Sequence, residues 1–138
     1  MVTPDGVRRH QVDDLPDLLT REDGVLWVDV PEGDPDAATV LADVFGFHPM
    51  AVQDSVHRSP VPKVHVYTDH VFVVLHAPES GAGGHVHYVE LDQFVGARYL
   101  VTVHGPVNPA VDPATASVST RAAAGSTAGL TGPCTVTR

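Results

Sequence analysis

The stretch Val25-Leu26-Trp27-Val28-Asp29-Val30 decides the fold class that this sequence of 138 residues predicts. It is rich in β-branched and aromatic residues, and Gly24 and Pro31 bound it, so we expect it to form a strand. Five of its six residues are apolar, which favours a strand covered on both faces, as in an α/β sheet. Trp27 is expected to anchor the core.

Directly after this strand, the apolar spacing changes to that of a helix. Asp34 can cap the helix, and Pro35 suits its first position. Apolar residues then recur every three or four positions and form one stripe: Ala37, Val40, Leu41, Val44 and Phe45. Gly46 is expected to end the helix in a left-handed conformation, and a second short helix is predicted from Pro49 to about Val56.

Two shorter elements are predicted before Gly24. Residues 7–12 are expected to form a first short strand. Leu15, Leu18 and Leu19 have the spacing of one side of a short helix that begins after two acidic residues.

Residues 62–104 predict a run of antiparallel hairpins. The apolar period falls to two, and strands are expected at 63–67, 71–76, 85–95 and 99–104. The glycine-rich stretch 80–84 predicts a hairpin tip. A first half that carries helices, followed by such a meander, favours a mixed sheet with helices packed against it, an α/β fold.

The composition changes after His104. Of the 34 residues from Gly105 to Arg138, 24 are Gly, Pro, Ala, Ser or Thr, and none is aromatic. Such a segment buries too little apolar area to offset the entropy of ordering it. We therefore expect a domain at residues 1–104 and a low-complexity, loose tail at residues 105–138.

The charge balance and the cysteine count exclude some partners and some cross-links. Lys plus Arg number 8 and Asp plus Glu number 17, for a net charge of -9, which argues against a nucleic-acid partner. The single cysteine, Cys134, excludes an internal disulfide.

The longest apolar run in the body of the chain, residues 71–75, is far shorter than the ~20 residues that cross a bilayer. We expect a cytoplasmic chain that does not itself insert into a membrane.

An ordered set of motifs resembles one family. Its members are Leu26–Pro31, then Phe45-Gly46-Phe47-His48-Pro49-Met50-Ala51-Val52-Gln53-Asp54, then Pro62-Lys63-Val64, and finally Leu91–Val95 with Tyr99–His104. Over about residues 7–104 the chain resembles the N-terminal cytoplasmic domain of CorA-type magnesium (divalent cation) transporters.

The resemblance implies an α/β/α sandwich built on a mixed sheet, and a regulatory role rather than an enzyme activity. In the family this domain belongs to a homopentamer in the cell membrane, lies on the cytoplasmic side, and leads into a stalk and two membrane helices. Magnesium bound between the cytosolic domains holds the channel closed. The implied partners are copies of this chain or a full-length CorA-like paralogue.

Two departures from the family pattern change these expectations. The sequence has no stalk, no membrane helices and no Gly-Met-Asn motif, so we expect a truncated chain that does not conduct ions by itself. The family usually carries Glu-Asp after the His-Pro helix, where this chain has Gln53 and Asp54. These two residues are the candidate magnesium ligands, and the loss of one carboxylate predicts weak regulatory binding.

A second hypothesis comes from another class of protein. His85 and His87 lie on the same side of a predicted strand, and His104 or Glu90 could approach them from neighbouring positions. Three histidines of this kind would suit a small stand-alone zinc metalloenzyme or metal-binding protein.

Overall fold

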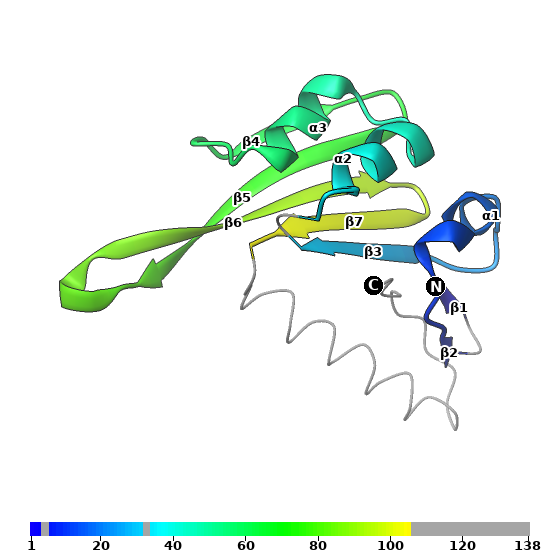
Figure 1. Ribbon diagram of the computed structural model, residues 1–138, viewed down its shortest axis with the longest axis horizontal. Helices are drawn as coiled ribbons and strands as arrows, with labels where there is room; N and C mark the ends of the chain where they lie inside the picture. Colours follow the sequence, from blue (N-terminus) through cyan, green and yellow to red (C-terminus); the bar gives the residue numbers. More distant parts are fainter. Residues whose placement is uncertain (4–5, 32–33, 106–138) are drawn as a thin grey trace.

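The computed structural model describes residues 1–3, 6–31 and 34–105, and its main feature is a mixed sheet with helices packed against it (Figure 1). The predicted tail lies, apart from Gly105, outside the described residues. The sheet has five strands in the order β3-β7-β6-β5-β4. Their bounds are β3 Leu26–Pro31, β4 Lys63–Val66, β5 His70–Ser80, β6 Val86–Gly96 and β7 Tyr99–His104.

The pairing directions confirm the predicted α/β class. Strand β3 pairs in parallel with β7. The three other pairs, β4 with β5, β5 with β6 and β6 with β7, are antiparallel and form the predicted meander. A parallel pair needs a crossover connection, and the helices between β3 and β4 are part of it.

The helical segment after β3 differs from the prediction of one regular α-helix. Helix α2 covers only Ala37–Thr39, and a π-helical turn, η2, follows at Val40–Val44. The Phe45 N–H bonds to the Val40 carbonyl at 3.3 Å, which places one extra residue in that turn. The predicted stop is confirmed, since Gly46 has a φ of 69°.

Helix α3, Pro49–Val56, has the predicted bounds. His48 caps it, because the His48 side chain accepts a hydrogen bond from the Met50 N–H at 3.2 Å. In Figure 1, α2 and α3 lie over the same face of the sheet.

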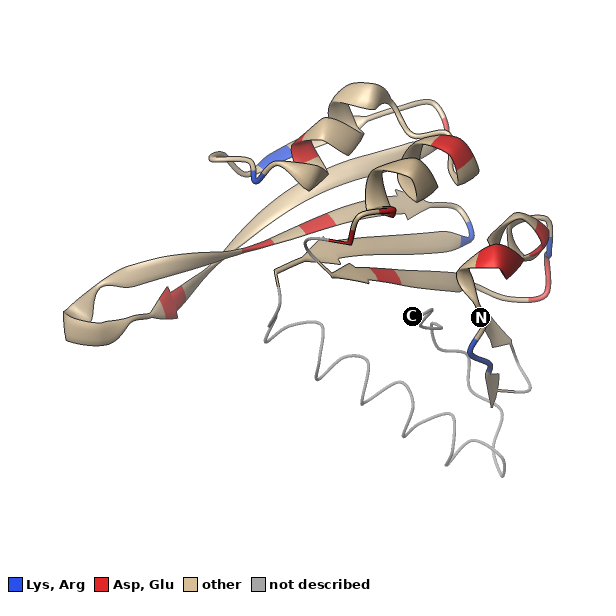
Figure 2. Cartoon of the chain, in the orientation of Figure 1, with Lys and Arg blue, Asp and Glu red and all other residues tan. Residues whose placement is uncertain are grey.

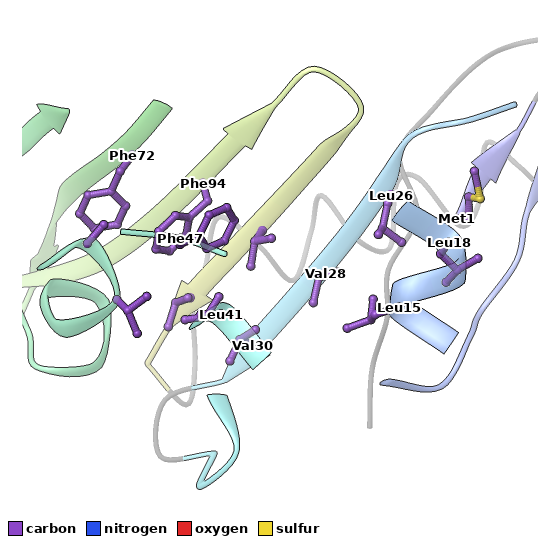
Figure 3. Packing of buried hydrophobic residues seen from close by; sticks show 14 of the residues in the cluster. Met1, Leu15, Leu18, Leu26, Val28, Val30, Leu41, Phe47, Phe72 and Phe94 are labelled. Atoms are coloured by element: carbon purple, nitrogen blue, oxygen red, sulfur yellow. The ribbon is translucent and has the colours of Figure 1, made fainter. Parts of the chain in front are cut away.

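The core lies between these helices and the sheet and continues to Met1, Leu15 and Leu18 at the N-terminal end (Figure 3). Phe47 stacks on Phe94 with ring centroids 4.1 Å apart, and Phe72 lies 4.6 Å from Phe94. Leu41, Phe72 and Phe94 have no exposed surface. Trp27 is 4% exposed, as predicted, but it points to the opposite face of the sheet from its neighbours Leu26 and Val28.

The N-terminal segment is less regular than predicted. Only β1, Val2–Thr3, and β2, Gly6–Val7, are extended, and they pair with each other. The strand predicted at residues 7–12 is wrong beyond Val7. The Asp14 carboxylate accepts the Gln11 N–H at 3.0 Å, and this begins a 3-10 turn, η1, at Val12–Asp14 that leads into α1, Leu15–Leu19.

Strands β5 and β6 extend beyond the rest of the sheet as a two-stranded arm (Figure 1). Strand β4 pairs only with residues 71–74 of β5, and on β6 only residues 91–95 pair with β7. From His76 and Glu90 outward, the two strands pair with each other alone. The short 3-10 turn η3, Ala82–Gly84, closes the arm at the predicted hairpin tip, and Gly83 and Gly84 have positive φ there.

Candidate metal site

The predicted magnesium ligands lie in the last turns of α3. The Gln53 side chain is exposed, and its backbone carbonyl accepts the His57 N–H at 3.0 Å. The Asp54 side chain is 32% exposed, and its Oδ2 lies 2.6 Å from Lys63 Nζ. Asp54 therefore already has a cationic partner within the chain.

Lys63 reaches Asp54 from the first residue of β4. Lys63 pairs with Val74 on β5, and Val74 pairs with Asp92 on β6, so the three residues form one row across the sheet beneath α3. In Figure 2 the basic stretch of β4 lies next to the acidic stretch of α3. The sequence drew attention to Lys63 only as part of a motif, and its role as partner of Asp54 was not predicted.

Asp92 is the second carboxyl group below α3. It is 1% exposed, and its Oδ1 has no hydrogen-bond partner among the described residues. Burial raises the pKa of Asp92 to about 8, and the neighbouring charges of Glu90 and Asp54 act in the same direction. The nearby Lys63 ammonium opposes this shift but does not offset it.

Glu90 lies two residues away on the same face of β6, and it is well paired. Its Oε1 accepts the Ser59 N–H at 2.8 Å, and its Oε2 lies 3.3 Å from His76 Nε2. The same His76 nitrogen is 3.0 Å from the Ser59 carbonyl. Glu90 thus fastens the loop after α3 to the sheet rather than joining a histidine site.

A small cavity of about 20 Å³ lies beside Asp92, room for about one water molecule. Its lining combines carboxyl, hydroxyl, guanidinium and imidazole residues with two valines: Ser55, Val56, Arg58, Glu90, Asp92, Val103, His104 and Gly105. We call Asp54, Lys63, Glu90 and Asp92 the α3 cluster.

The histidines of the zinc hypothesis are not brought together. His85 and His87 lie at the tip of the arm, where both are exposed. His104 is buried at the end of β7, opposite Leu91 on β6, four residues from His87. Within residues 1–3, 6–31 and 34–105, no group of three or more His, Cys, Asp or Glu side chains could hold a metal ion.

His104 belongs instead to a second polar cluster on the face of the sheet opposite α3. The Trp27 Nε1–H donates to Thr102 Oγ1 at 3.0 Å, and the Thr102 hydroxyl donates to Asp29 Oδ1. Asp29 Oδ2 lies 3.2 Å from His104 Nε2, and His104 Nδ1 lies 2.6 Å from the Gly105 carbonyl. We call these four side chains the Trp27 cluster.

None of the described helices has both the length and the apolar character needed to span a membrane. The helical elements are short, and the longest of them, α3, has eight residues.

Comparisons with known proteins agree with the architecture. A family model described as CorA-like Mg2+ transporter protein matches residues 22–131. A curated protein, "Putative metal ion transporter YfjQ" of Bacillus subtilis (strain 168), is 31% identical over 85 residues, which cover 62% of this chain and 26% of that protein.

Solved structures share the fold. The complete CorA magnesium transporter from Methanocaldococcus jannaschii superimposes with a TM-score of 0.59 at 19% identity, over 74% of this chain and 32% of that one. The soluble domain of the same organism's CorA gives 0.56 at 18% identity, over 68% and 37%. Full-length CmaX gives 0.57 at 19% identity, over 68% and 29%.

The chain thus spans between about a quarter and two fifths of the length of these proteins. The family match covers most of the chain and includes β3, the helical crossover and the meander. This chain therefore belongs to the family of CorA-like Mg2+ transporter proteins.

Proposed function

We propose that residues 1–104 act as the cytoplasmic regulatory and assembly domain of a CorA-like divalent-cation transporter, rather than as an enzyme. The observation that carries this proposal is the position of Asp54, a partly exposed carboxylate at the end of α3, on a fold of the CorA family. Its partners are copies of the same chain or a full-length CorA-like paralogue. A homopentamer at the cytoplasmic side of a membrane is the expected assembly.

Magnesium is the ligand that we propose for this domain. Mg²⁺ keeps most of its waters and binds through one or two carboxylates, so Asp54 and the exposed carbonyl oxygen of Gln53 suffice for a weak site. Because the described residues do not supply three ligands together, the site requires waters or a second copy of the chain to complete it. We expect a millimolar dissociation constant, equivalent to about 4 kcal/mol.

The test is a magnesium titration of the full chain, followed by NMR amide shifts along α3 and by sedimentation velocity. We expect residues around Asp54 to shift at millimolar MgCl2 and the mean mass to rise. Asp54→Asn should remove both responses. Asp43→Asn, which removes an exposed carboxylate from η2, is the matched control and should leave both responses intact.

Gln53→Glu is the gain-of-function counterpart, because it restores a second carboxylate beside Asp54 and should tighten magnesium binding. Micromolar magnesium affinity in the isolated wild-type monomer would contradict the proposal. So would a magnesium response that Asp54→Asn leaves unchanged.

A further inference from the structure

Lys63 lies within reach of two carboxyl groups, those of Asp54 and Asp92. Its Nζ lies 2.6 Å from Asp54 Oδ2. On the sheet it shares a row with Val74 and Asp92. Neighbouring strands lie about 4.8 Å apart, so the Cα atoms of Lys63 and Asp92 are roughly 10 Å apart. The extended lysine and aspartate side chains together span most of that separation.

Asp92 has an unpaired oxygen that could accept the Lys63 ammonium. It is 1% exposed, it faces α3, and its Oδ1 has no partner among the described residues. Buried polar atoms are paired in the great majority of cases, so an unpaired buried carboxyl oxygen calls for an explanation. The small cavity beside Asp92 leaves room for about one water molecule.

We propose that Lys63 is a tethered competitor for the cation at Asp54, and that Asp92 receives the Lys63 ammonium when the cation takes its place. The inference rests on the proposed function, since it assumes that Asp54 binds Mg²⁺. It adds Lys63 and Asp92 to the cation site as positioning residues that the cation does not touch.

The charges around the row favour such an exchange. Without a divalent cation, the Lys63 ammonium neutralises Asp54. A divalent cation on the same carboxylate repels the ammonium, which then needs another acceptor within reach. Asp92 can be that acceptor, because its Oδ1 has no hydrogen-bond partner among the described residues.

Charged groups on the elements packed around Asp92 shift the balance between its protonated and ionised forms. Glu90 on β6 and Asp54 on α3 disfavour a carboxylate there, and Lys63 on β4 favours one. Arg58 and His104 line the same cavity. Burial holds the pKa of Asp92 at about 8, so the group carries a proton near neutral pH. The arriving ammonium favours the carboxylate form, and the proton leaves to solvent.

The experiment uses the fact that Lys63 is the only lysine in the sequence. Lysine labelled with ¹³C at Cε therefore gives a single side-chain NMR signal in the full chain. During a MgCl2 titration we expect this signal to move together with the α3 amides. In Asp92→Asn the lysine signal should stay near its starting position, and magnesium affinity should fall.

Affinities of three variants complete the test. Lys63→Met removes the competitor and should tighten magnesium binding about fivefold, the equivalent of a partly buried ion pair. In the Lys63→Met background, Asp92→Asn should have no further effect on affinity, because its role depends on Lys63. Arg21→Met, which removes a positive charge in the loop after α1, is the control and should leave the affinity unchanged.

The outcomes separate this inference from the proposed function. If Asp54→Asn abolishes magnesium binding but Lys63→Met leaves the affinity unchanged, the competitor role is wrong and the proposed function stands. If α3 does not respond to magnesium in the wild type or in Lys63→Met, both are wrong. Lys63→Gln replaces Lys63→Met if circular dichroism shows that the methionine variant does not fold.

Discussion

The Trp27 cluster, on β3 and β7, and the α3 cluster, on α3, β4 and β6, lie on opposite faces of the same sheet, and their central aspartates have different hydrogen-bond partners. In the Trp27 cluster, both Asp29 oxygens have partners, Thr102 and His104. In the α3 cluster, Asp92 is more deeply buried, and its Oδ1 has no partner among the described residues. The two aspartates lie on strands of one sheet, separated by β7.

The difference shows how one fold uses polar groups for two purposes. A network in which each member is paired holds its parts in one arrangement, and removing any member leaves the others unsatisfied. A buried carboxyl group without a full set of partners instead remains responsive to protons and cations. The face with the fully paired network is therefore expected to stabilise the fold. The face below α3 is expected to change its charge or its contacts when protons or cations bind.

The largest expected effect is the pH-dependent stability gained by Asp92→Asn. The folded-state pKa of Asp92, about 8, lies above its unfolded value, so the folded state holds the proton more tightly. Its contribution to stability is complete below the unfolded pKa and is lost as the pH rises from about 4 to about 8. Asparagine mimics the protonated acid, so the variant should gain up to about 5 kcal/mol relative to wild type over that range.

The measurement is urea unfolding of both proteins at several pH values between 4 and 9. The difference between their free energies of unfolding isolates Asp92 from the other titrating groups. A constant difference across this range would show that Asp92 is ionised in the folded protein, and the contrast between the two clusters would then disappear.

Asp29→Ala should lower the stability of the folded protein, the opposite of the effect expected for Asp92→Asn. It leaves the Thr102 hydroxyl and His104 Nε2 without their acceptor in a buried setting. Breaking such a pair costs about 3 kcal/mol. Thermal unfolding at pH 7 measures the loss, and Asp29→Asn, which still accepts from Thr102, should lose less. Equal losses in the two variants would show that the Asp29 charge contributes nothing to the cluster.

Trp27→Phe is expected to have the smallest effect of the three. It removes the hydrogen bond from the indole N–H to Thr102 Oγ1 and leaves the remaining bonds of the cluster in place. One net hydrogen bond is worth about 1 kcal/mol. A double-mutant cycle with Thr102→Val would isolate that bond, and a coupling energy near zero would remove Trp27 from the network.

Much of the fold could be predicted from the sequence because it rests on local periodicity. The strand at 26–31, helix α3 and the meander all have apolar spacings that a single segment reveals. The π-helical turn at Val40–Val44 could not be predicted, because the same stripe of residues suits an α-helix. The true length of the arm was also missed, since residues 77–80 are polar or small and give no strand signal.

The candidate site was predictable only in part. Asp54 and Gln53 could be named from the resemblance to the family, but the partner of Asp54 depends on strand register, which no local pattern shows. Lys63 and Asp92 are separated by 28 intervening residues and meet only because both pair through Val74. The three-histidine hypothesis used spacing along one strand, and the length of the arm separates its members.

The position of β7 between two partner strands also has a mechanical consequence. The strand lies between β3 and β6 and is hydrogen-bonded to both. A pulling force applied at Gly105 along the strand direction would have to shear both ladders at once, rather than peel one strand from an edge. A domain connected in this way can transmit tension along β7 without unfolding from one edge.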